Sequence, residues 1–155
     1  VGHRPASHSV RPMIADDMDA VFYVRISVVD NHMDDDELRE IGITREGVAE
    51  QLKSGELEGW CAVADGNVVG FSIATAETRE VNALFVLPDN ASCGIGRDLL
   101  DAAVQYLRDR APGAVRLRTD PNSPAFAFYL RRGWRDTGEK YEEGVRDSDR
   151  FLELE

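Results

Sequence analysis

The chain has 155 residues, of which 43% are hydrophobic, and its 29 acidic and 18 basic residues give a formal net charge of −11. These values favour one folded domain, and the negative charge disfavours nucleic acid as substrate or partner. No apolar run approaches the roughly 18 residues of a membrane span, and the N-terminus has no signal pattern. We therefore expect a cytoplasmic protein without a membrane partner, and Cys61 and Cys93 do not suggest a disulfide framework.

The first third of the chain predicts one strand followed by helices. Asp16 or Asp17 can cap the first helix, and Thr44 can begin another whose inner face carries Val48 and Leu52. In order, we expect a loose polar leader at 1–9, a strand at 8–13, a helix at 18–29, an acidic loop at 31–36, a short helical turn at 37–41 and a helix at 44–53. Residues 10–155 are predicted to form a single domain.

From Gly59 the apolar residues follow a period of two, which indicates strands. Asp65, Gly66 and Asn67 are typical of a tight hairpin turn, so a strand at 59–64 should pair antiparallel with one at 68–74. A turn at 75–79 then leads into a strand that begins at Glu80.

The stretch from 80 to 100 combines a strand, a loop of small residues and a helix. Leu99, Leu100 and Val104 recur on one helical face, and the loop before them contains Gly94 and Gly96. Free N–H groups at a helix start can hold an anion, so the loop is a candidate phosphate site. A tight turn without a ligand explains the same glycines, and neither a dinucleotide fingerprint nor a P-loop is present.

The last third predicts a strand at 115–119, a helix and two final strands. Ser123 can cap the helix, with Pro124 at its first position and Gly133 at its end. One strand should open at Trp134 and the last should cover 150–154. The order of elements predicts an α/β chain with a mixed sheet.

Two of these motifs, taken together, resemble the GNAT (Gcn5-related N-acetyltransferase) superfamily. One is the strand, loop and helix at 80–107; the other is NSPAFAFYLRRGW at 122–134, which fits the family's Asn-x-x-Ala-x-x-Phe-Tyr-x-x-x-Gly-aromatic run. The resemblance covers about 10–154. It implies the GNAT fold, a largely antiparallel mixed sheet of about six or seven strands, splayed in the middle and flanked by about four helices.

By this resemblance the cofactor is acetyl-CoA. The backbone of Leu84, Phe85 and Val86 would pair with the pantetheine arm, and Asn122 would contact the cofactor from the facing strand. The diphosphate would be held by the loop residues Ala91, Ser92, Cys93, Gly94, Ile95, Gly96 and Arg97. Ala91 and Cys93 stand where the family usually carries Gln or Arg and a basic residue, so Arg97 is the expected substitute.

The resemblance also supplies candidate catalytic residues. Tyr129, which also counts among the cofactor contacts, would protonate the departing thiolate, and Glu80 would act as general base. Packing in the core is the alternative role for Tyr129, and solvent exposure is the alternative for Glu80, with a water chain as base. His32 is a second candidate base, and no spacing of His, Cys and Asp suggests a metal site.

We thus expect direct transfer of an acetyl group from acetyl-CoA to a primary amine of a small molecule or peptide. The negative net charge is compatible with a cationic small molecule or a basic peptide as acceptor, and a well-solvated acidic surface is the alternative explanation of the same charge. A homodimer is also compatible with the sequence. A CoA-binding sensor or regulatory domain without turnover is the alternative, which the altered loop favours.

Overall fold

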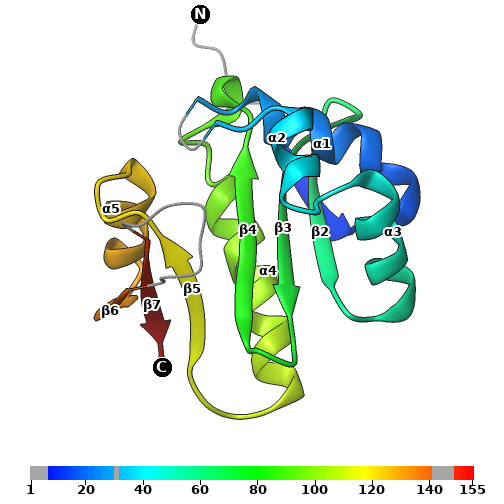
Figure 1. Cartoon of the computed structure of the whole chain (residues 1–155). Helices are drawn as coiled ribbons and strands as arrows, with labels where there is room; N and C mark the ends of the chain where they lie inside the picture. Colours follow the sequence, from blue (N-terminus) through cyan, green and yellow to red (C-terminus); the bar gives the residue numbers. More distant parts are fainter. Residues whose placement is uncertain (1–6, 30–31, 141–148) are drawn as a thin grey trace, which may run out of the picture.

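The computed structural model describes residues 7–29, 32–140 and 149–155. Within these ranges seven strands form one sheet, in the order β1-β2-β3-β4-β5-β7-β6 (Figure 1). The strands are β1 (His8–Pro12), β2 (Glu58–Ala64), β3 (Asn67–Thr75), β4 (Glu80–Val86), β5 (Val115–Thr119), β6 (Arg135–Lys140) and β7 (Arg150–Leu154). Neighbouring strands are antiparallel except β4 and β5, which are parallel.

Helices cover both faces of this sheet (Figure 1). They are α1 (Met18–Ser27), α2 (Asp35–Glu40), α3 (Arg45–Ser54), α4 (Ile95–Arg110) and α5 (Pro124–Arg131), with short 3-10 helices at Ala15–Asp17 and Pro88–Asn90. Alternation along β3 separates two layers of the core, because Phe71 and Ile73 pack toward α1–α3 while Ser72 faces α4. The buried Ser72 hydroxyl donates to the Leu99 carbonyl at 2.9 Å, which ties α4 to the sheet.

The predicted elements are present, with shifted ends. The first strand includes His8 and Ser9, which are the last residues of the expected leader. Residues 1–6 of that leader lie outside the described ranges. The first helix ends at Ser27, and the turn expected at 37–41 is the helix α2. Asp34 caps the start of α2, because its carboxylate accepts from the Glu37 N–H at 2.8 Å. The described chain therefore has five α-helices where about four were expected.

The sheet opens between β4 and β5. Among the described residues these strands are paired at two positions, Glu80 with Arg116 and Val81 with Leu117. Just beyond, Asn82 forms a bulge in β4, because Ala83 pairs with Ile73 while Val81 pairs with Ala74. The two parallel strands therefore diverge toward their carboxyl ends, which confirms the splayed sheet.

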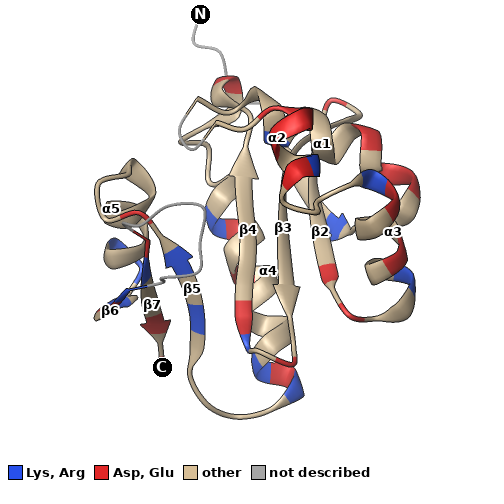
Figure 2. Ribbon diagram, in the orientation of Figure 1, with Lys and Arg blue, Asp and Glu red and all other residues tan. Residues whose placement is uncertain are grey.

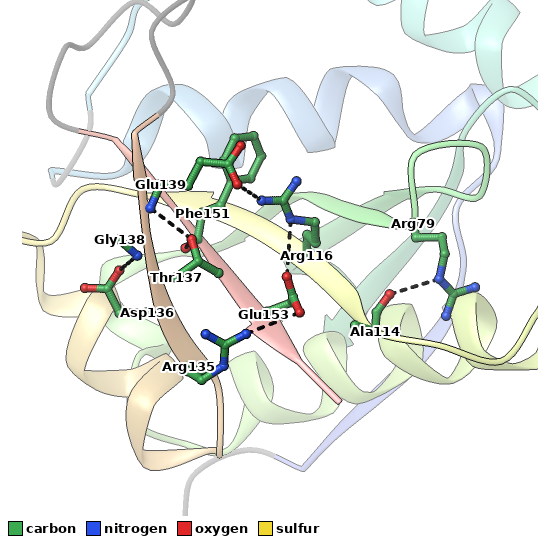
Figure 3. A network of polar contacts seen from close by, with 10 residues as sticks. All are labelled: Arg79, Ala114, Arg116, Arg135, Asp136, Thr137, Gly138, Glu139, Phe151 and Glu153. Atoms are coloured by element: carbon green, nitrogen blue, oxygen red, sulfur yellow. Dashed lines mark hydrogen bonds and ion pairs between the residues drawn. The ribbon is translucent and has the colours of Figure 1, made fainter.

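Polar contacts fix the strands on the far side of this opening (Figure 3). Arg116 of β5 contacts Glu139 of β6 at 2.6 Å and Glu153 of β7 at 3.7 Å, and Glu153 also contacts Arg135 at 3.4 Å. Arg79, before β4, donates to carbonyls at the end of α4 and in the following loop, including Ala114 at 2.9 Å.

Within the described ranges, no helix has the length and apolar composition needed to cross a membrane.

Candidate active site

A cavity of about 420 Å³ fills the opening between β4 and β5. One wall is formed by residues 81–86 of β4, and the opposite wall by residues 117–120 at the end of β5. Ala125 and Tyr129 of α5 also line it, together with Val29 after α1. Because β4 has left its parallel neighbour here, the backbone of Leu84, Phe85 and Val86 lies along a space wide enough for a ligand, as the pantetheine prediction requires.

The loop before α4 has the geometry of an anion site. Ser92 and Gly94 have φ angles of +64° and +80°, and the first helical hydrogen bond runs from Asp98 N–H to the Gly94 carbonyl. No described residue accepts a hydrogen bond from the backbone N–H groups of residues 92–97. Such N–H groups at the positive end of a 16-residue helix can hold a phosphate.

Charged side chains flank this loop. A Cβ at Gly94 would meet the Arg97 guanidinium at 2.9 Å, so Arg97 folds back over the loop as its predicted role requires. Asp98, also in the first turn, lies 2.6 Å from His8 Nε2, and this hydrogen bond lowers the pKa of the Asp98 carboxyl. Cys93 Sγ lies 3.5 Å from the Ala91 carbonyl, and its side chain is partly buried against the core beneath.

Tyr129 lies on the side of the cavity formed by α5. Its side chain is 8% exposed and packs edge-on against Trp134, with ring centroids 6.0 Å apart. No described residue forms a hydrogen bond with its hydroxyl, and burial raises the pKa of the phenol above its usual value. Tyr129 therefore keeps its proton at neutral pH beside the cavity, although it also packs in the core.

The candidate bases lie further from the cavity. The Glu80 carboxylate accepts from Arg118 Nε at 2.7 Å, and the side chain is 13% exposed. Arg118 lines the cavity but Glu80 does not. His32 is exposed, with Nδ1 3.0 Å from the Val28 carbonyl, and it does not line the cavity either.

Asn122 is exposed and does not line the cavity, and its backbone N–H donates to Asp120 Oδ1 at 2.9 Å. The neighbouring residues Thr119, Asp120 and Ser123 line the cavity instead. Residues next to Asn122 thus line the cavity, and the contact proposed for the Asn122 side chain stays a prediction.

A second cavity, of about 650 Å³, lies on the other side of β4 toward α1–α3. It is adjacent to the first, because both are lined by Asn82, Ala83, Phe85, Arg118 and Asp149. Sequence reasoning missed Arg118 and Asp149, since no motif marks them. The Arg25 guanidinium lies 4.4 Å from the centroid of the Phe85 ring at this junction.

Charge is unevenly distributed around the two cavities. Figure 2 shows acidic residues concentrated on α1–α3 and basic residues on β5, the wall that faces the first cavity. Among the described residues, the one basic side chain that lines this cavity is Arg118, and it is paired with Glu80. Two carboxylates, Asp120 and Asp149, line the cavity as well. The loop of unpaired N–H groups is therefore the feature that fits an anionic cofactor such as CoA. In the described part of the chain, no cluster of three or more His, Cys, Asp or Glu side chains is placed to bind a metal ion.

Comparisons with known proteins agree with this arrangement. The sequence profile of the acetyltransferase (GNAT) domain matches residues 29–148. Peptidyl-lysine N-acetyltransferase YjaB of Salmonella typhimurium is 36% identical over 80 residues, 51% of this chain and 51% of that protein. Mycothiol acetyltransferase of Clavibacter sepedonicus is 38% identical over 76 residues, 47% of this chain and 25% of that protein. The chain thus covers about half or less of each of these relatives.

One solved structure has the same fold over nearly its whole length. PaiA N-acetyltransferase of Thermoplasma acidophilum, in complex with coenzyme A, superimposes with a TM-score of 0.75. The comparison covers 96% of this chain and 99% of that one, at 18% identity.

Proposed function

Because the chain belongs to the GNAT acetyltransferase family, we propose that it transfers an acetyl group from acetyl-CoA directly to a primary amine. The observation that carries this proposal is the meeting of two cavities at β4. The first runs along the splayed strand β4 and reaches Ala91, in the loop before α4, so CoA could lie along both. The second could take the acceptor. Two ligands that enter from opposite sides of β4 would meet at the shared residues without a covalent enzyme intermediate.

The loop and β4 would hold the cofactor. Backbone N–H groups of residues 91–97, with Arg97, would bind the diphosphate, and the backbone of residues 84–86 would bind the pantetheine arm. Acetyl-CoA supplies a thioester whose carbonyl carbon accepts the amine nitrogen and whose C–S bond then breaks. Tyr129 holds a proton at its hydroxyl beside the cavity and would donate it to the sulfur, so that CoA leaves as a thiol.

The acceptor must also lose a proton before it attacks, because an ammonium has no free electron pair. Glu80 is our candidate for this base, with His32 as the second. Since Glu80 lines neither cavity, its proton transfer would pass through water or through rearrangement beside Arg118. We also propose that the protein acts in the cytoplasm and forms a homodimer.

The test is the release of free CoA thiol from acetyl-CoA in the presence of a panel of primary amines, measured with a thiol reagent. We expect release that depends on both the protein and an amine, together with the acetylated amine in equal amount by mass spectrometry. A rise in melting temperature with acetyl-CoA should accompany it, because ligand bound only to the native state stabilises that state.

A CoA-binding sensor would give a different result. The absence of basic side chains at Ala91 and Cys93 favours this second candidate. In that case acetyl-CoA would raise the melting temperature but no amine would release thiol. If acetyl-CoA changed neither quantity while the protein was folded, both proposals would be wrong.

A further inference from the structure

The second cavity is lined largely by apolar side chains. They come from three helices and from the sheet face beneath them, and include Val21, Phe22, Leu38, Val48, Phe71 and Ile73. Ile41 and Ile43, in the loop between α2 and α3, also line it, yet they are 43% and 41% exposed. Two large apolar side chains that are partly exposed to solvent therefore stand where this cavity opens.

Polar groups of this cavity gather mainly at its junction with the first. Arg118 and Asp149 both lie there, and Arg118 also holds Glu80. Asp149 is the one acidic side chain among the described residues that line the second cavity. The acidic residues of α1–α3 (Figure 2) thus do not line the cavity.

An acceptor in this cavity meets two environments. Polar or multiply charged groups buried against the apolar walls would lose water without gaining partners, whereas an apolar group would gain from burial. At the junction, where the amine must reach the thioester, the lining holds the Asp149 carboxylate together with the guanidinium groups of Arg25 and Arg118. One carboxylate can attract a single ammonium, whereas the two guanidinium groups repel further positive charges. The cavity therefore favours acceptors that carry a large apolar group and a single positive charge.

We propose, on the basis of the acetyltransferase function proposed above, that the acceptor is a primary amine carried by a bulky apolar group. The apolar group occupies the cavity between α1–α3 and β3–β4, and the ammonium lies beside Asp149. This narrows the expected cationic acceptor to one with a single positive charge and excludes polyamines as the preferred substrates. Ile41 and Ile43 contribute specificity, and Asp149 binds the reacting amine.

The first test compares amines of matched reactivity in the thiol-release assay. We expect kcat/KM for 2-phenylethylamine to exceed that for ethylamine and for spermidine by at least about tenfold, since each buried methylene contributes discrimination in an apolar pocket. The double variant Ile41→Ser, Ile43→Ser should lower this ratio by about 3- to 10-fold, mainly through KM for 2-phenylethylamine. Ile14→Ser is the matched control, because Ile14 is 54% exposed and lines neither cavity.

Asp149→Asn tests the ammonium end. It should raise KM for ethylamine and 2-phenylethylamine alike by about tenfold, a larger factor than any change in KM for acetyl-CoA. A higher kcat/KM for spermidine than for 2-phenylethylamine, or equal ratios in the double variant and wild type, would overturn the inference while the proposed function stood. An unchanged amine KM in Asp149→Asn would overturn the placement of the ammonium.

Binding measurements separate this inference from the proposed function. If no amine supports turnover, titration calorimetry of 2-phenylethylamine into protein saturated with CoA still reports on the cavity. Binding that weakens in the isoleucine double variant and not in Ile14→Ser would support the apolar site in a protein without that activity. Absence of binding, or stronger binding of spermidine, would refute it.

Discussion

Replacement of Tyr129 by phenylalanine removes one oxygen atom from the wall of the first cavity. The ring stays the same size, so its packing against Trp134 and Phe128 should persist. Because no described residue forms a hydrogen bond with the hydroxyl, its loss leaves no buried partner unsatisfied. We expect the free energy of unfolding to change by less than about 1 kcal/mol.

The effect on catalysis should be much larger. Burial raises the pKa of Tyr129, so the phenol keeps its proton over the whole working pH range and remains able to donate it. Loss of a general acid typically costs about 10²-fold or more in rate, which corresponds to about 2.7 kcal/mol in the activation free energy. We therefore expect kcat for Tyr129→Phe to fall by about 10²-fold with little change in the affinity for acetyl-CoA.

The assay is steady-state thiol release at saturating acetyl-CoA, with acetyl-CoA affinity measured separately by calorimetry. Tyr106→Phe is the control, because Tyr106 packs edge-on against Trp60 at 5.4 Å and lines neither cavity. A kcat for Tyr129→Phe within about twofold of wild type would make Tyr129 a packing residue and refute the reasoning. A parallel loss of kcat and melting temperature would point to altered packing instead.

Three further predictions concern other groups. Glu80→Gln should lower kcat at pH 7 and lose less at high pH, where free amine is already present; a uniform loss across the pH profile would argue against a base. Cys93 should react with iodoacetamide much faster than Cys61, because Cys61 is fully buried and burial raises the pKa of its thiol to about 12. Bound CoA should slow the labelling of Cys93, measured by mass spectrometry. Equal labelling with and without CoA would place the Cys93 thiol away from the cofactor. The hydrogen bonds from Arg11 lower the pKa of Asp17 in the folded state. The Asp17 carboxylate therefore stabilises the folded protein above the unfolded-state pKa of about 3.9, and this contribution is lost as pH falls through the lower folded-state pKa. Asp17→Asn should lower the free energy of unfolding by about 2 kcal/mol at pH 7, measured by urea denaturation, and should flatten the loss of stability below about pH 4.

Local signals in the sequence predicted much of the fold. Asp65 and Gly66 have φ angles of +52° and +79°, which few other residue types adopt easily, and they join β2 to β3 as the turn residues indicated. Pro124 opens α5 after Ser123 for a similar reason, because its fixed φ suits the first helical turn. In these cases neighbouring residues along the chain determine the conformation.

The site was less predictable because its contacts join distant residues. Arg118 reaches Glu80 across 38 positions, and His8 reaches Asp98 across 90. Neither pair belongs to a motif, and the bulge at Asn82 depends on how β3 and β4 pair. The direction of the Asn122 side chain likewise depends on the turn around it, so the motif could locate the turn without fixing the contact.

The short pairing between β4 and β5 has a consequence for the motions of the molecule. Strands β1–β4 form one hydrogen-bonded unit and β5–β7 another, with two described pairs of residues between them. Side chains of α4 pack beneath both units, and Arg79 fastens the loop that leads from α4 into β5. Sub-global opening along this seam should let the amides of β6 and β7 exchange with deuterium sooner than those of β2 and β3. A ligand that spans the seam would slow that exchange, and would thereby join two separately fluctuating halves into one cooperative body.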